Sequence, residues 1–188
     1  FKKNENELNE LRKKKLVNDF LILENKKLRD LINESSQSED IYAKVLIDKN
    51  SPYLKSIILN KGSKDNVKIG MAIVDDSYLI GKIIEVNYTN SRALLLSDLN
   101  SKIPVLLEPL DIHAVLSGSG KDFGLIEYTK DGYDQQISGE EIIVYTSGYG
   151  DLFKSGMPVG KIIKNKITGQ NVVNFFSDFK QLNYIKIV

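Results

Sequence analysis

The sequence predicts a mainly β protein in which an N-terminal α-helix is followed by two small β-barrels of six strands each. Residues 1–34 contain no glycine and no proline, which favours one continuous helix. From residue 41 onward, short apolar runs with alternating polarity recur about every ten residues and are separated by turn residues. Many short strands at this spacing are typical of small barrels and sandwiches.

The totals exclude several classes of function. With 188 residues, the chain has room for one or two small domains and an appendage. A net charge of +1 gives no electrostatic reason for a nucleic-acid partner. Without cysteine there is no disulfide framework, thiolate metal site or thiol nucleophile. The chain begins at Phe1 without an apolar run of about 20 residues, so we expect a soluble piece of a longer protein.

The helix, residues 1–34, is predicted to form a coiled coil. One heptad frame places leucine or isoleucine and asparagine in the seam, at Leu11, Asn18, Leu21, Asn25, Leu28 and Ile32. Asparagine at a with leucine at d is typical of parallel two-stranded coils, because paired buried asparagines fix the register. This frame is imperfect, because Lys14 falls at a d position, and a second frame through Val17, Leu21, Leu28 and Leu31 puts Glu24 in the seam. The alternative is a single amphipathic helix packed on its own domain.

The polar residues 35–40, SSQSED, predict a linker, and the period then changes from helical to alternating. The first barrel domain is expected at residues 41–108, with strands at 41–47, 53–59, 71–74, 78–86, 91–97 and 102–107. Pro109 and the Ser-Gly run 117–120 indicate a boundary near residue 109. The second barrel domain is expected at 109–176, with strands at 112–116, 123–129, 141–145, 157–166 and 171–176. A last strand within residues 177–188 either stays there or returns to the first barrel.

No pattern in the sequence indicates catalysis, a metal or a cofactor. The one histidine, His113, lies near Asp111, Ser117 and Ser119 on one expected strand, whereas a catalytic triad draws its members from separate loops. The aspartates in turns lack calcium-loop spacing. Gly148-Tyr149-Gly150 is followed by an aspartate rather than by a phosphate-binding helix start. We therefore expect binding modules that use loops and open sheet edges.

The glycine-rich stretch 146–163, TSGYGDLFKSGMPVGKII, partly repeats an earlier one, KGSKDNVKIGMAIV followed by YLIGKIIEV. The glycines indicate tight turns. Two aromatic residues on this stretch, Tyr149 and Phe153, are candidates for partner contact, because a loop on a rigid scaffold can present such anchors. The alternative is structural, with Phe153 closing the end of a barrel.

Several phrases together carry a resemblance to a known family, at residues 23–32, 51–74, 79–86, 91–105 and 146–162. In this order and spacing the chain resembles the MreC family of bacterial rod shape-determining proteins over nearly its whole length. It departs modestly in the loop, where Asp151 and Lys154 stand in place of an expected glycine and proline. The departures affect the expected turn conformation and leave the resemblance in place.

The resemblance implies a fold of a coiled coil and two barrels that are similar to chymotrypsin-like barrel halves without catalytic residues. It implies a non-enzymatic scaffold of the cell-elongation complex that self-associates, recruits or activates the peptidoglycan synthesis machinery and so maintains cell shape. It places this scaffold on the periplasmic face of the inner membrane, anchored by an N-terminal span outside this chain. The implied partners are a second copy, the elongation-specific class B penicillin-binding transpeptidase, MreD, MreB and RodA. Filaments are an alternative assembly to the homodimer.

Two other functions fit parts of the pattern. A periplasmic adaptor of an efflux pump also combines a coil with β domains, but it predicts a helical hairpin with a returning helix. A serine-protease-like enzyme would use Ser117 or Ser119.

Overall fold

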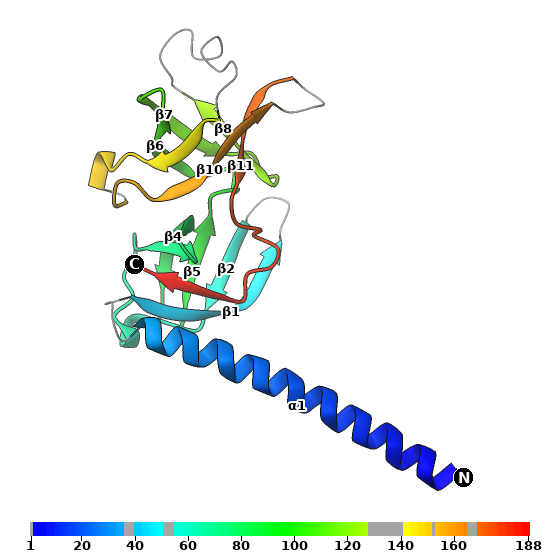
Figure 1. Ribbon diagram of the computed structural model, residues 1–188. Helices are drawn as coiled ribbons and strands as arrows, with labels where there is room; N and C mark the ends of the chain where they lie inside the picture. The colour runs from blue at the N-terminus through cyan, green and yellow to red at the C-terminus, as the bar shows by residue number, and fades with distance from the viewer. Residues whose placement is uncertain (1, 36–39, 51–54, 128–140, 152, 165–168) are drawn as a thin grey trace. The chain divides into compact units, whose positions relative to one another are not determined.

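A computed structural model describes residues 2–35, 40–50, 55–127, 141–151, 153–164 and 169–188. They form one helix and two closed antiparallel barrels of six strands each, so the predicted fold class is confirmed (Figure 1). The helix belongs to one compact unit, Phe1–Asp40, and both barrels belong to a second, Ile41–Val188. Residues 36–39 of the expected linker lie outside the described residues.

The helix α1 spans Lys2–Ser35. It is rich in leucine, lysine, glutamate and arginine, which lose little conformational freedom in a helix. Its asparagines are weaker helix formers, and Asn25 compensates by donating its side-chain N–H to the Leu21 carbonyl one turn earlier, at 3.1 Å. The side chains described on this helix, residues 10–29, are nearly all exposed.

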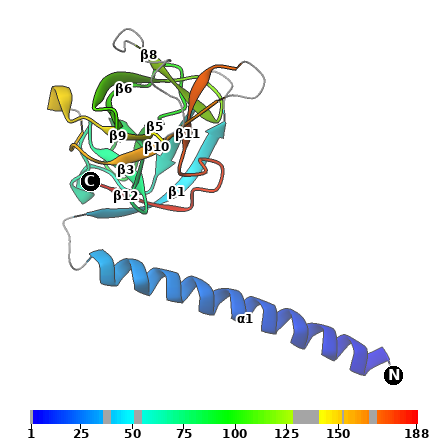
Figure 2. The same ribbon diagram turned by 45° about the horizontal axis from the view of Figure 1, so that its top comes forward.

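The first barrel, called barrel 1 below, contains the first five strands of the chain and the last one. Its ring order is β1-β12-β3-β4-β5-β2, and Figure 2 labels β12 near β1 and β3. The strands are β1 (Ile41–Asn50), β2 (Lys55–Leu59), β3 (Ala72–Asp75), β4 (Tyr78–Val86), β5 (Ser91–Leu95) and β12 (Tyr184–Ile187).

The second barrel, barrel 2, is one continuous stretch of chain with the ring order β10-β11-β8-β7-β6-β9. Alternation is clear in the first part of β7, where Ile112, Ala114 and Leu116 point into the barrel and His113 points outward. The strands are β6 (Lys102–Glu108), β7 (Ile112–Gly118), β8 (Phe123–Glu127), β9 (Ile143–Thr146), β10 (Pro158–Lys164) and β11 (Asn171–Phe175).

The boundary between the barrels lies between β5 and β6, one strand earlier than residue 109. The expected boundary is wrong because Pro109 lies in the hairpin turn that joins β6 to β7, and β6 pairs with β7 and β9. The Ser-Gly run 117–120, which was also expected to indicate the boundary, begins inside β7, which includes Ser117 and Gly118. The C-terminal strand β12 lies in barrel 1, between β1 and β3.

Both barrels have the same ring topology. If β4 is matched to β10, the neighbours around each ring match in turn, so that β1–β5 correspond to β7–β11 and β12 corresponds to β6. The matched strands carry the repeated phrase, IGKII in β4 and VGKII in β10. The resemblance between the two stretches of sequence therefore reflects a repeated architecture.

The apolar cores of the two barrels are joined. One buried cluster lies within barrel 1, around Ile57, Ile73 and Ile185. The other fills barrel 2 and continues into the facing side of barrel 1, where it includes Val74 and Leu79. The two barrels thus share an apolar contact.

Candidate partner-binding surfaces

The residues tested for a catalytic triad are dispersed. Asp111 lies in the β6–β7 turn with a positive φ of 52°, and His113 is exposed on β7. The Ser119 hydroxyl donates to the Phe123 carbonyl. Among the described residues no hydrogen bond joins His113 to Ser117 or Ser119, so the geometry offers no activated hydroxyl.

Ser117 lies beside an ion pair of barrel 2, formed by Lys102 and Glu127. The nearby Ser117 hydroxyl, together with the Lys102 ammonium 3.1 Å away, lowers the pKa of Glu127. These three residues come from β7, β6 and β8, which are neighbours in the ring. The Lys102–Glu127 ion pair therefore bridges β6 and β8 across β7, beside Ser117.

The aspartates in turns also bond locally. Asp65 follows a tight turn at Gly62 and accepts hydrogen bonds from the Gly62 N–H at 3.1 Å and the Lys61 ammonium at 3.0 Å. Burial alone would raise the pKa of Asp65, but these two donors outweigh it and the pKa lies below its usual value. Within the described ranges no group of three or more histidine, cysteine, aspartate or glutamate residues could hold a metal ion.

The buried Thr146 connects the two ends of the loop between β9 and β10 by hydrogen bonds. Its N–H donates to the Met157 carbonyl at 2.9 Å, and its carbonyl accepts from the Gly156 N–H at 2.9 Å. The Thr146 hydroxyl accepts from the Met157 N–H at 2.9 Å. These bonds fix the two ends of the loop, and the short 3₁₀ helix η2 (Tyr149–Asp151) lies between them.

The two aromatic candidates on this loop lie in different environments. Phe153 is only 7% exposed and belongs to the apolar core of barrel 2. Tyr149 is 62% exposed, and its ring contacts the edge of the exposed His113 ring at a centroid distance of 4.8 Å. Only Tyr149 is therefore placed to touch a partner, and Phe153 holds the loop against the barrel.

The residues of the predicted coiled-coil seam are available on the helix surface. Leu11, Leu21 and Leu28 are exposed, as are Asn18 and Asn25, whereas the side chain of Ile32 lies outside the described residues. Other apolar side chains are exposed on the helix as well, namely Leu16, Val17, Phe20, Ile22 and Leu23. Apolar residues on several sides mean that exposure alone does not select between the two heptad frames.

The closed rings change the expected mode of binding. Because every described strand has two neighbours in its ring, none of them presents an open edge for another chain to pair with. The expectation of open sheet edges is therefore wrong for these barrels. Exposed loop side chains are the alternative.

Sequence reasoning missed two such side chains on barrel 1. Tyr88 and Ile69 are 73% and 69% exposed, and both lie in loops that flank β4 or β3. The phrase Asn87-Tyr88-Thr89-Asn90 was interpretable only as a turn. An aromatic residue within such a turn, as at Tyr149, is the signal that would have pointed to it.

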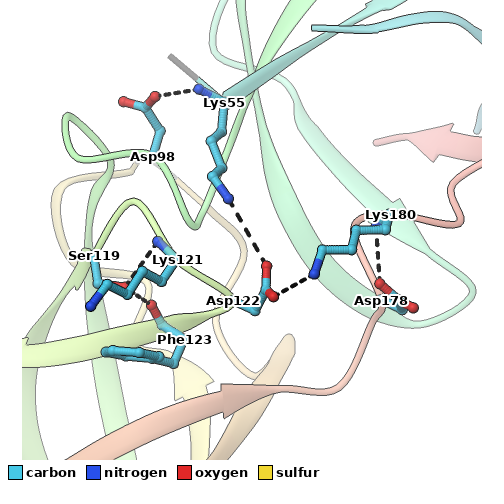
Figure 3. A network of polar contacts seen from close by, with 8 residues as sticks. All are labelled: Lys55, Asp98, Ser119, Lys121, Asp122, Phe123, Asp178 and Lys180. Atoms are coloured by element: carbon cyan, nitrogen blue, oxygen red, sulfur yellow. Dashed lines mark hydrogen bonds and ion pairs between the residues drawn. The ribbon is translucent and has the colours of Figure 1, made fainter. Parts of the chain in front are cut away.

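A polar network links the barrels near the two segments of chain that connect them (Figure 3). The buried Asp98, on the segment from β5 to β6, accepts from the Lys55 N–H at 2.6 Å. Asp122, in the β7–β8 turn, accepts from the Lys180 ammonium at 2.6 Å and lies 4.0 Å from the Lys55 ammonium. These contacts hold barrel 1, barrel 2 and the returning segment together.

In the part of the chain that the structure describes, no helix combines the length and the apolar character needed to cross a membrane.

Comparison with known proteins gives one family. The model of the family described as "Rod shape-determining protein MreC, barrel core" matches residues 45–188. The cell shape-determining protein MreC of Haemophilus influenzae is 33% identical over 150 residues, which cover 78% of this chain and 42% of that protein. MreC of Caulobacter vibrioides is 29% identical over 146 residues, which cover 78% and 41%. The chain thus spans about two fifths of the length of these curated relatives.

Solved structures have the same fold. The crystal structure of MreC from Pseudomonas aeruginosa is 25% identical, with a TM-score of 0.68 over 80% of this chain and 99% of that one. The major periplasmic domain of "the cell shape-determining filament MreC" is 18% identical, with a TM-score of 0.64 over 79% and 93%. A complex between PBP2 and MreC from Helicobacter pylori contains a chain that is 15% identical, with a TM-score of 0.54 over 79% and 98%. The last two show the fold alone.

With a family model matched across both barrels and the same double-barrel fold in the solved structures, the chain belongs to the MreC family of rod shape-determining proteins.

Proposed function

We propose that this chain is a non-enzymatic scaffold of the cell-elongation complex that binds its partners on the periplasmic face of the inner membrane. The observation that carries the proposal is the family match across both barrels. The relatives are named for determining cell shape, and one neighbour in fold was solved as a complex with a penicillin-binding protein. An N-terminal membrane span outside this chain would anchor the scaffold.

Self-association is assigned to the helix. Its exposed leucines would leave water if two helices paired, and each fully buried leucine contributes roughly 1.5–3 kcal/mol. Asn18 and Asn25 at the a positions would favour a parallel pair in one register. A homodimer would present two copies of each barrel surface, and filaments are the alternative assembly.

The partner assigned to the barrels is the elongation-specific class B penicillin-binding transpeptidase. Tyr149 supports this assignment, because an exposed aromatic side chain on a loop whose ends are hydrogen-bonded to each other loses little conformational freedom on binding. The other proposed partners, MreD, MreB and RodA, follow from the family and have no surface assigned to them.

Two alternatives lose support. An efflux-pump adaptor would need a second long helix that returns along the first, and the described residues contain one α-helix. A serine-protease-like enzyme would need a base beside Ser117 or Ser119, and His113 instead contacts Tyr149.

The proposal is tested by adding the purified chain to the transpeptidase and measuring both binding and the rate of peptide crosslinking. We expect saturable binding and an increased rate. If the chain with its helix intact neither binds the enzyme nor changes its rate, the scaffold proposal fails. A probe for reactive serines tests the enzyme alternative, which predicts labelling of Ser117 or Ser119.

A further inference from the structure

The strand that closes barrel 1 reaches it only after the chain has built barrel 2. Between β5 and β12 the chain runs through residues 96–183, and barrel 2 occupies residues 102–175 of this stretch. Figure 1 shows β12 in red beside β1, whereas β11 lies in the other barrel. Barrel 2 therefore has all six of its strands in one continuous segment, while barrel 1 depends on a strand delivered from beyond it.

The strand β12 is short, and it is held by its pairing with β1 at four positions and with β3 at two. β12 is four residues long and buries two side chains in barrel 1, Ile185 and Ile187. At its end, Val188 and Ala72 exchange two backbone hydrogen bonds of 3.0 and 3.1 Å. At its start, the Asn183 carbonyl accepts from the Val45 N–H at 2.8 Å.

The segment before β12, residues 176–183, is fastened to barrel 2 at one point in particular. Asp122 of barrel 2 accepts from the Lys180 ammonium at 2.6 Å, and this hydrogen bond raises the pKa of Lys180 (Figure 3). Beside it, the Phe179 ring packs against the cores of both barrels. The segment is thus connected to both barrels, with one ion pair on its surface and one ring beneath it.

The segment has further contacts, since the Phe176 N–H donates to the Val159 carbonyl at 3.1 Å, the Phe176 ring lies 5.0 Å from the Tyr78 ring, and Leu182 packs on the core of barrel 1. One side of the segment is nevertheless hollow. A hollow of about 320 Å³ lies beside it, lined by Asp122 and residues 174–180. The Ser177 hydroxyl is buried and has no hydrogen-bond partner among the described residues. A buried hydroxyl without a partner is unfavourable, so the packed state of this segment is less stable than that of a fully bonded one.

We propose that residues 176–188 form a detachable strap, by which barrel 2 holds barrel 1 closed. The strap opens as a local unit while both barrels otherwise stay folded, since segments with little buried apolar surface open at a lower free energy than the core strands. The alternative is that β12 opens only when the whole barrel unfolds.

Folding of barrel 2 favours the closed strap because it shortens the loop of chain that must be ordered when the strap closes. With barrel 2 folded, only residues 96–101 and 176–183 remain to be ordered between β5 and β12. This loop is about sixfold shorter than the whole stretch 96–183. Closure of barrel 1 is therefore about 16-fold more favourable when barrel 2 is folded than when barrel 2 is unfolded. Stabilising barrel 2, as a partner bound at Tyr149 would under the proposed function, therefore favours closure of barrel 1.

An engineered disulfide tests the strap in the full chain. Tyr42 on β1 faces Lys186 on β12. Because Val45 bonds to Asn183, alternation along the ladder makes the 42–186 pair a non-hydrogen-bonded one, the kind whose side chains lie closer. The chain has no cysteine, so a Tyr42→Cys, Lys186→Cys protein can form only this bond within one molecule. Its reduced and oxidised forms have the same sequence and serve as each other's control.

Hydrogen exchange of named amides gives the readout. The N–H groups of Val45, Ala72 and Val188 bond across the strap, whereas those of Ile83 and Leu96 bond elsewhere in barrel 1. In the reduced form we expect the strap amides to exchange at least about tenfold faster than the other two, and oxidation to remove most of this difference. If all five exchange at one rate in the reduced form, the strap is not a separate unit and the proposal is overturned.

The ion pair is tested separately by Asp122→Asn. Loss of an exposed pair costs little, so we expect the strap amides to exchange about threefold faster while Ile83 is unchanged. The matched variant Asp111→Asn removes the same charge from another exposed turn of barrel 2 and is expected to change none of them. Equal effects of the two variants would remove the ion pair from the proposal. Neither experiment involves the transpeptidase, so both outcomes are independent of the proposed function.

Discussion

Two glycines at matching positions set how closely neighbouring strands approach in the two barrels. A Cβ on Gly81 would lie 2.1 Å from the Leu94 carbonyl oxygen, and one on Gly160 would lie 2.3 Å from the Asn174 carbonyl oxygen. Both atoms belong to the backbone of the adjacent strand, which has little room to move. The repeated Gly-Lys-Ile-Ile phrase thus has a steric cause in each ring.

Replacing Gly160 with alanine is expected to lower the free energy of unfolding by roughly 1–3 kcal/mol or more, because the strands must separate. Urea denaturation measures this change. Lys161→Ala, at the next and outward-facing position of β10, is the control and is expected to change stability by about 0.5 kcal/mol or less. Equal losses in the two variants would contradict the steric argument.

The two aromatic residues of the β9–β10 loop are expected to contribute very differently to stability. Phe153→Ala removes a buried ring and is expected to cost roughly 3–5 kcal/mol of stability. Tyr149→Ala removes an exposed ring and is expected to cost about 0.5 kcal/mol or less. Thermal denaturation of both variants checks the contrast, and a large loss in Tyr149→Ala would show that this side chain supports the loop.

Asp65 predicts a pH dependence. Its pKa is lower in the folded chain than its ordinary value, so the folded state is stabilised when the group is ionised, above its ordinary pKa of about 3.9. This stabilisation is lost as the pH falls through the lower folded pKa. The difference in unfolding free energy between the unmodified chain and Asp65→Asn should therefore shrink between pH 7 and pH 3. A difference that stays constant would disprove the linkage.

At the scale of single residues, the sequence identifies candidate residues better than it predicts whether they are buried or exposed. Tyr149 and Phe153 have similar surroundings along the chain, and only the packing of strands far away in sequence makes one exposed and the other buried. Gly62 is another case. Glycine in a tight turn often has a positive φ, but the φ of Gly62 is −140° and its Cβ would instead meet the backbone of residues 87–90. Contacts between distant segments decide both cases.

At the scale of elements, short apolar runs bounded by turn residues located the twelve strands of the described residues, because such runs are a local property of the chain. It did not assign every strand to its barrel. β6 was expected in the first barrel because Pro109 indicated a domain boundary where the chain forms the β6–β7 hairpin turn. Its pairing with β9 depends on a return of the chain that no local pattern records. The repeated Gly-Met pair precedes β3 in barrel 1, but in barrel 2 it precedes β10, which is the counterpart of β4. The repeat in sequence therefore does not match strand for strand.

The helix yields a prediction for self-association. Leu21→Asp places a charge at a d position of the proposed seam, where burial of an unpaired charge is strongly unfavourable. We expect the mass of the full chain to fall from dimer to monomer in sedimentation equilibrium. Leu16→Asp makes the same change at an f position, outside the seam, and is the matched control. If both variants sediment like the unmodified chain, the proposed seam is wrong.

At the scale of the whole molecule, the repeated ring topology and the shared apolar contact make the two barrels a joint platform. Closed rings leave loops and exposed side chains to do the binding, and this follows from the ring order and not from any motif. The family assignment could be predicted from the order and spacing of several phrases. The position of the binding surface could not, since the phrases that identify the family are mostly turns and core strands.

The central claim is that this platform binds the elongation-specific class B penicillin-binding transpeptidase. Isothermal titration calorimetry of the full chain with that enzyme tests the claim most directly. We predict a saturable isotherm, and an affinity at least about tenfold weaker for Tyr149→Ala, since exposed aromatic anchors dominate such interfaces. Tyr88→Ala, an exposed tyrosine of barrel 1, shows whether the effect is specific to the loop. Heats no greater than dilution for the unmodified chain would contradict the account.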